Sequence, residues 1–222
     1  MQALSFLALC AIVLTSPKLQ AQEPGPVVFS EIMWMGSGTS SADEWIELYN
    51  RGTKAIDLTG WTITRTGTDG AEQEMVTIGE GTIAAGGTFL IANYSGTSSR
   101  SQLATTVQFV SSAVALPNSK LQLYLYDSPK GGHLVDTADD GTGRPLGGTT
   151  EPPSAMVREV FGISGSEPEA WSTATESHGW RSGAIELGTP GALPTRLQPK
   201  GDTRATGVAG TTWAHMKAGN RN

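Results

Sequence analysis

Residues 43–50 have the sequence DEWIELYN, and how this stretch is interpreted decides the predicted fold and function of the chain. Four apolar or aromatic side chains are interleaved with three acids, which suits either a carboxylate-rich active site or a β-strand. In a strand, successive side chains point to opposite faces, so Ile46 and Leu48 share one face. Glu47 lies on the other face, between a tryptophan and a tyrosine, and is the acid whose burial is in question.

The composition favours the strand. The chain has 222 residues with 28 glycines and 12 prolines, and charged residues make up 16%. That charged share is well below the quarter that is usual for soluble globular proteins, and turn residues are abundant. The formal net charge of −6 argues against a general nucleic-acid binder. These features predict a turn-rich, all-β domain.

Short apolar and β-branched runs recur every 8 to 14 residues, with turn signals between them. The expected strands cover residues 27–34, 45–49, 56–64, 75–78, 88–93, 108–110, 120–126, 133–137 and 156–161. No window of 12 residues in this part of the chain has helical periodicity. The pattern is typical of a β-sandwich or a β-barrel.

The two ends of the chain differ from its middle. Residues 1–22 hold a short apolar run followed by SPKLQAQ, which predicts a secretory signal peptide. The only cysteine, Cys10, lies in this segment, so the mature chain is expected to have no disulfide and no thiolate metal site. Residues 23–193 carry 9 basic and 20 acidic side chains, a net −11, and form the predicted domain. Residues 194–222 carry 5 basic and 1 acidic side chains, a net +4, and are expected to be a disordered tail.

A series of motifs, in this order, carries a resemblance to a known family: VVFSEIMWMG, DEWIELYN, IDLTGWTI, GTIAAGGTFLIA, LPNSKLQLYLYDSPKGGHLVD, AMVRE and GTPGA. Together they resemble the lamin tail domain, over roughly residues 27–193. The resemblance implies an immunoglobulin-like antiparallel β-sandwich. The lamin tail domain family occurs in nuclear lamins and in secreted bacterial proteins. Of these, the bacterial secreted branch resembles this chain more. The family brings no catalytic residue set, and Ser30 stands where it typically has asparagine.

The acids of the first two motifs, Glu31 and Glu47, lie on strands that could pair. The structural interpretation is a buried polar network in which both bind Arg158, with Asn50 at the end of the second strand. The alternative is a shared carboxylate site for Ca²⁺. Asp43 and Glu44 are expected at the strand edge, in contact with solvent.

Other candidates also have two interpretations. Trp171 and Trp180 form either an exposed platform for a carbohydrate ligand or a cap on one end of the sandwich. The acidic run 136–143, DTADDGTG, lacks the spacing of an EF-hand loop and is interpreted as a turn. The end of the tail is either a recognition segment or a solvated spacer. No cofactor, no metal site and no catalytic residue are predicted.

The sequence therefore predicts a secreted or cell-surface, non-catalytic binding or structural module. The alternative is an accessory subunit that targets a separate secreted nuclease or other hydrolase. An enzyme in its own right is the third possibility, disfavoured because catalytic spacings are missing. The expected partner is an undefined protein or an envelope polysaccharide. Neither specific nucleic-acid binding nor a transmembrane span after cleavage is expected.

Overall fold

A computed structural model describes residues 23–129 and 132–198. The predicted signal peptide and residues 199–222 of the predicted tail lie outside the described residues. The strands are β1 (Val27–Met33), β2 (Trp45–Asn50), β3 (Ile56–Asp57), β4 (Thr62–Thr66), β5 (Glu72–Thr77), β6 (Thr82–Ile83), β7 (Thr88–Ala92), β8 (Phe109–Val110), β9 (Leu123–Tyr126), β10 (Leu134–Ala138), β11 (Thr149–Thr150), β12 (Pro153–Ser154), β13 (Met156–Arg158) and β14 (Trp171–Thr173). Two short 3₁₀ helices follow Glu167 and Pro194, η1 (Pro168–Ala170) and η2 (Thr195–Leu197).

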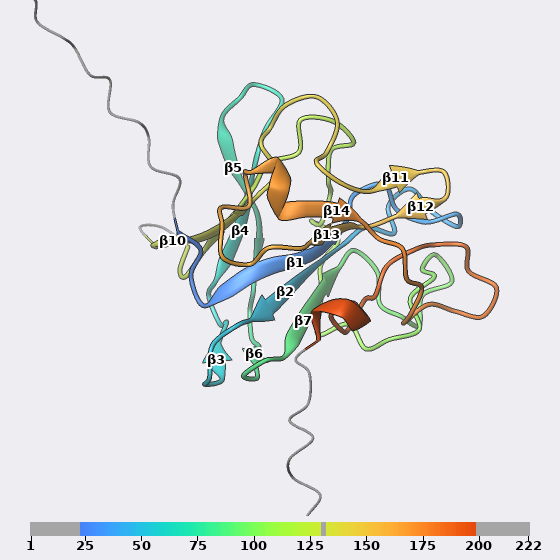
Figure 1. Cartoon of the computed structure of the whole chain (residues 1–222), viewed down its shortest axis with the longest axis horizontal. Helices are drawn as coiled ribbons and strands as arrows, with labels where there is room; N and C mark the ends of the chain where they lie inside the picture. Colours follow the sequence, from blue (N-terminus) through green and yellow to red (C-terminus); the bar gives the residue numbers. More distant parts are fainter. Residues whose placement is uncertain (1–22, 130–131, 199–222) are drawn as a thin grey trace, which may run out of the picture.

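The strands form two main sheets, which Figure 1 shows packed as layers. The larger sheet, called the first sheet, has the order β14-β13-β1-β2-β7-β8, and only its β7–β8 pair is parallel. The smaller, second sheet has the order β10-β9-β4-β5. Two small ribbons, β11-β12 and β3-β6, complete the described part. The molecule is an immunoglobulin-like β-sandwich, so the predicted all-β fold is confirmed.

The core lies between the sheets and forms one large apolar cluster. Its members are wholly buried side chains from both sheets, such as Phe29, Ile46 and Leu48 of the first and Ile63 and Leu125 of the second. Ile46 and Leu48 are thus in the core, as the alternation of DEWIELYN predicts. The β1 and β10 strands connect the two layers, because the backbone N–H of Phe29 donates to the Asp136 carboxylate at 2.9 Å.

An irregularity in β1 determines which side chains face away from this core. Phe29 pairs with Leu48 and Glu31 pairs with Glu47, so the register shifts at Ser30. Such a β-bulge inserts one residue and re-aims the side chains beyond it. Strict alternation would put Phe29 and Glu31 on the same face. The bulge instead turns Glu31 to the outer face of the first sheet, beside Glu47.

The outer face of the first sheet is covered by the chain that follows β14. We call residues 174–193 the covering segment. The indole ring of Trp180, in this segment, lies 5.9 Å from that of Trp45 in β2, centroid to centroid. All six residues of β2 are consequently buried, on both faces of the sheet.

Three boundaries differ from those expected from the sequence. The polar run 72–74 is part of β5, because Glu74 and its neighbours pair with β4 at the sheet edge. Trp171 begins a strand, β14, and does not lie in a loop. The domain also continues past residue 193, because Arg196 forms ion pairs with Glu159 and Glu176. No helix in the described ranges is both long and apolar enough to cross a membrane.

Candidate functional site: a buried carboxylate network

Glu31 and Glu47 face each other across β1 and β2, and both are wholly buried. We call these two acids, with the groups that bind them, the carboxylate network. The bulge at Ser30 and the alternation of β2 turn both side chains to the outer face of the first sheet. There they meet the covering segment and not solvent.

Each carboxylate accepts hydrogen bonds from the stretch Gly188–Ala192 of the covering segment. The Thr189 backbone N–H donates to Glu31 Oε1 at 2.9 Å, and its hydroxyl donates to Oε2 at 2.7 Å. The Gly191 N–H donates to Glu47 Oε2 at 2.6 Å, and the Ser30 hydroxyl donates to Oε1 at 3.1 Å. The two acids therefore hold the end of the covering segment against the sheet.

Glycine at positions 188 and 191 is a requirement of this close approach. A Cβ atom at residue 188 would lie 2.8 Å from Glu31 Oε1, and one at residue 191 would lie 2.5 Å from Thr105 Oγ1. Gly191 also has φ +91°, which L side chains rarely adopt. The sequence GTPGA is thus fitted to the two acids beneath it.

Burial raises the pKa of both carboxyl groups. Desolvation raises the pKa of Glu31 to about 7, although hydrogen bonds from Thr189 favour its charged form. Desolvation and the nearby Glu31 raise the pKa of Glu47 to about 8. At neutral pH the pair therefore holds at least one proton, which lessens the cost of burying two like charges.

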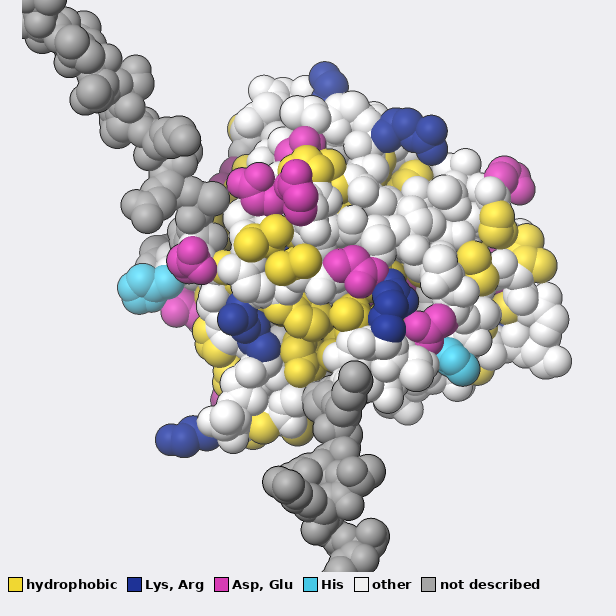
Figure 2. Space-filling view, in the orientation of Figure 1, with side chains coloured by type: hydrophobic (Ala, Val, Ile, Leu, Met, Phe, Trp, Pro, Cys, Tyr) yellow, Lys and Arg dark blue, Asp and Glu magenta, His cyan; other side chains and the backbone are white. Residues whose placement is uncertain are grey.

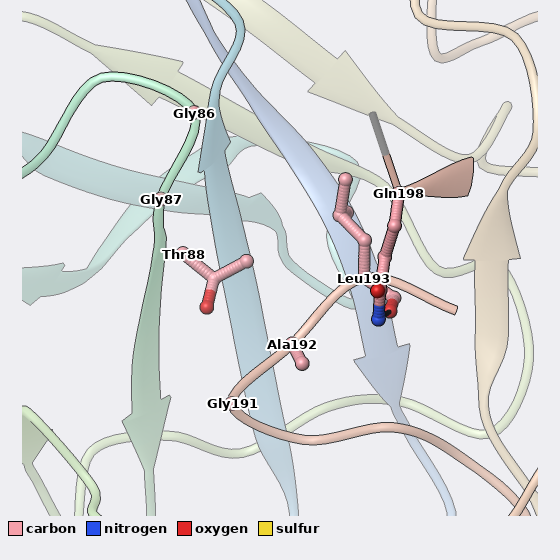
Figure 3. A pocket seen from close by; sticks show the side chains of 7 residues that line it. All are labelled: Gly86, Gly87, Thr88, Gly191, Ala192, Leu193 and Gln198. Carbon is pink, nitrogen blue, oxygen red and sulfur yellow. Dashed lines mark hydrogen bonds between the residues drawn. The ribbon is translucent and has the colours of Figure 1, made fainter. Parts of the chain in front are cut away.

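A shallow cleft of about 330 Å³ lies beside the network (Figure 3). The cleft lies between the turn before β7 and the end of the covering segment. Its lining residues are Gly86, Gly87, Thr88, Gly191, Ala192, Leu193 and Gln198, none of them charged. Thr88 also hydrogen-bonds Glu47, but Glu47 itself is not exposed to the cleft.

The hydroxyl of Thr189 should contribute measurably to stability. Thr189→Val keeps the side-chain volume and the backbone N–H, but it removes the shorter of the two hydrogen bonds to Glu31 Oε2 and leaves only the one from the N–H at 3.2 Å. We expect a loss of about 1–3 kcal/mol in the free energy of unfolding, measured with urea. Thr175→Val, at an exposed position of the same segment, is the matched control and should change stability by less than about 0.5 kcal/mol. Equal effects of the two substitutions would contradict the assigned role.

Arg158 does not bind Glu31 or Glu47, and here the expectation was wrong. Its guanidinium pairs with Asp136, with Nη1 3.4 Å from Oδ2, and both side chains are buried. It also donates to the Ile163 carbonyl at 2.6 Å and lies 5.0 Å above the Trp171 ring. Val157 pairs with Glu31 across β13 and β1, so Arg158, the next residue of β13, points to the other face of the sheet, where Asp136 of β10 lies. Asp136 and Arg158 thus form a second, separate polar site.

Asn50 is also separate from the two acids. Its side-chain amide donates to the Lys54 carbonyl at 2.8 Å and to the Ile83 carbonyl at 3.2 Å, and its Oδ1 accepts from the Gly52 N–H at 2.9 Å. Asn50 therefore fixes the turn that leaves β2. The single network expected from the sequence is in fact three independent buried polar sites.

The two tryptophans do not form an exposed platform. Trp171 is buried in β14, where its indole N–H donates to the Gly165 carbonyl at 2.7 Å. Trp180 is partly buried, packs on Trp45 and donates to the Gly188 carbonyl at 2.9 Å. The platform interpretation is therefore wrong, because both indoles pack within the fold.

Asp43 and Glu44 are buried, contrary to the expectation that they contact solvent. Asp43 Oδ2 accepts from the Gln102 N–H at 2.7 Å, and Glu44 Oε2 accepts from the Leu116 N–H at 2.9 Å. Desolvation raises the pKa of Glu44 to about 7. Both acids are covered by loops that are far away in the sequence, which strand alternation does not reveal.

The buried acids of the run 136–143 bind other residues of the fold. Asp139 is buried, and its two oxygens accept from the N–H groups of Asp140 at 2.8 Å and Leu146 at 2.7 Å. Asp136 belongs to the ion pair with Arg158. Within residues 23–129 and 132–198, no three or more Asp, Glu, His or Cys side chains group together as metal ligands.

The family model of the Lamin Tail Domain matches residues 20–142. The chain belongs to the lamin tail domain family. No curated protein matches this chain. The match ends before β13, yet β13, β14 and the covering segment complete the same lamin tail domain, because β13 pairs with β1. Lamin tail domains are immunoglobulin-like and non-catalytic as a family.

Sequence reasoning missed Thr189 and Asp136, the residues that bind the predicted site residues of this lamin tail domain. GTPGA was visible as a motif, and its two glycines are the signal that could have been read as a close backbone approach. Asp136 had no such signal, because its partner is determined by the packing of β10 beside β1.

Proposed function

We propose that this lamin tail domain is secreted and acts as a non-catalytic binding module at the cell envelope. The observation that supports the proposal best is the burial of Glu31 and Glu47, the strongest candidates for catalytic acids. Both are enclosed under Gly188–Ala192 and bound to its N–H groups, so a substrate cannot reach them. These acids bind the covering segment, and binding of a partner is left to the surface.

The partly buried side chains of Phe161 and Leu197 leave some apolar surface accessible above the covered outer face of the first sheet. Buried Val28, Tyr49 and Leu193 form a small apolar cluster with partly buried Phe161 and Leu197. Figure 2 shows hydrophobic side chains gathered near the middle of the face that carries β1 and β2, with both acidic and basic side chains around them. An apolar group surrounded by charges is typical of a protein interaction site. It supports a protein or polysaccharide partner bound outside the core.

Cell fractionation tests the proposed location. The full chain is compared with a chain that ends at Gln198, since η2 and the Arg196 ion pairs belong to the domain. We expect the full chain on the cell surface and the shortened chain in the medium. A full-length control with residues 199–222 in scrambled order shows whether sequence or only composition retains the protein. If neither chain leaves the cell, the proposed secretion is wrong.

The non-catalytic part of the proposal has its own test. Purified full-length protein should show no metal-dependent nuclease activity. Nuclease activity that disappears in Glu31→Gln would contradict the proposal. A hydrolase that co-purifies with the wild-type chain would instead indicate an accessory targeting subunit.

A further inference from the structure

Two buried carboxylates at one end of the first sheet each have an oxygen without a partner. Asp43 is 1% exposed and Glu186 is 0% exposed. Asp43 Oδ1 and Glu186 Oε2 have no hydrogen-bond partner among the described residues. Neither acid takes part in the ion pairs of this part of the chain. A buried carboxylate oxygen that has neither a donor nor a cation is costly, so these two oxygens require an occupant.

Both acids contact one loop, residues 36–42, GSGTSSA, Glu186 through its carboxylate and Asp43 through its backbone. Glu186 Oε1 accepts from the Gly38 N–H at 2.7 Å. Asp43 follows the loop directly, and its N–H donates to the Ser40 carbonyl at 3.0 Å. Gln102 connects the two sides, because its N–H donates to Asp43 Oδ2 at 2.7 Å while its side-chain amide donates to the Thr39 hydroxyl. Glu186 therefore contacts Gly38, and Asp43 is connected through Gln102 to the next residue, Thr39.

The two acids are also connected through the covering segment. Asp43 lies two residues before β2, and its carboxylate accepts from the N–H of Gln102, whose carbonyl in turn accepts from the N–H of Arg181 in the covering segment. Glu186 belongs to the same covering segment. Arg181, the basic residue nearest to Glu186 in sequence, donates to the carbonyl groups of Gly96 and Ser98 and not to either acid.

We propose that Asp43 and Glu186 bind a Ca²⁺ ion beneath the loop 36–42. Ca²⁺ takes six to eight oxygen ligands, and carboxylates, carbonyl groups and water commonly supply them. The loop itself carries four hydroxyl groups, on Ser37, Thr39, Ser40 and Ser41, besides its backbone carbonyl groups, and these are oxygen ligands of the kind that Ca²⁺ takes. Its exposed residues give an ion a route from solvent. Only two protein charges meet the ion, so the affinity expected is that of extracellular calcium modules, with Kd on the order of 10⁻⁴–10⁻³ M.

Terbium luminescence tests the site directly in the full-length protein after removal of divalent cations with EGTA. Trp45 is only two residues from Asp43, so excitation of tryptophan should sensitise bound Tb³⁺. We expect Tb³⁺ emission that saturates at one ion per chain and that Ca²⁺ displaces. Asp43→Asn and Glu186→Gln should each weaken Ca²⁺ competition at least about tenfold. Added Ca²⁺ should also raise the melting temperature of the wild type.

Asp139→Asn is the matched control. Asp139 is equally buried, but both its oxygens already accept backbone N–H groups. This variant should be less stable and yet keep the Tb³⁺ signal and the Ca²⁺ effect on melting. If Asp43→Asn does not fold, Glu186→Gln carries the test. Absence of sensitised emission, or Ca²⁺ binding that both substitutions leave unchanged, overturns the inference. The titration is made in solution and does not depend on the proposed location.

Discussion

Arg158→Leu should destabilise the domain by about 3–5 kcal/mol, the largest effect expected from a single substitution here. Arg158 and Asp136 are an isolated buried ion pair, and Leu fills part of the space but leaves Asp136 uncompensated. Desolvation already raises the pKa of Asp136 to about 6, and Arg158 is the main group that opposes this rise. Without Arg158 the carboxyl should take up a proton more readily. The loss of stability should therefore be smaller at pH 5 than at pH 8, in urea unfolding measured at both.

Two further variants make this prediction specific. Arg196→Leu removes ion pairs that are partly exposed, with Glu159 and Glu176, and should cost less than about 1 kcal/mol. Asp136→Asn combined with Arg158→Leu removes the unpaired charge but keeps an acceptor for the Phe29 N–H. The double variant should be more stable than Arg158→Leu alone. A double variant that is less stable would show that the guanidinium acts through packing on Trp171 and not through its charge.

Stability should fall as pH rises from about 5 to 8, and Glu47→Gln should remove much of this fall. The folded-state pKa values of Glu31 and Glu47, about 7 and 8, lie above the ordinary value of 4.5. The folded protein therefore binds more protons than the unfolded chain across this window, and unfolding is favoured as pH increases. Each proton contributes roughly 1.4 kcal/mol per pH unit. Burial of Glu44 acts in the same direction.

Glu47→Gln mimics the protonated carboxyl and still offers an oxygen to the Gly191 N–H. We expect it to be close to wild type in stability at pH 5 and more stable by roughly 2–3 kcal/mol at pH 8. Glu176→Gln is the control: hydrogen bonds from Thr195 lower the pKa of Glu176, so its titration is complete below this window. It should leave the slope unchanged above pH 5. A wild type whose stability rises with pH between 5 and 8 would refute the raised pKa values.

Strand alternation predicted one part of the site well. DEWIELYN placed Ile46 and Leu48 in the core and Glu47 on the other face, because period-two patterns follow directly from strand geometry. The same rule failed for Glu31. A β-bulge has no reliable sequence signature, and the bulge at Ser30 is what turns Glu31 toward Glu47.

Long-range packing determined the rest of the site. Arg158 was expected to bind Glu31 and Glu47, but it forms its ion pair with Asp136 on β10. Asp43 was expected in solvent, but residue 102 covers it from a distant loop. Trp171 was assigned to a loop because a three-residue strand is too short to show a pattern. Contacts between residues far apart in sequence decide these positions, and local rules do not report them.

The covering segment also has a consequence for how an incomplete chain behaves. The hydrogen bond to Glu31 in β1 comes from Thr189, 158 residues later in the chain, and β1 also pairs with the late strand β13. A chain that is made from its N-terminus therefore cannot close its outer layer until nearly all of the domain is available. A product cut short before residue 180 lacks the groups that cover the β2 tryptophan and the two carboxyl groups. Such a product should be more sensitive to proteases than the complete domain.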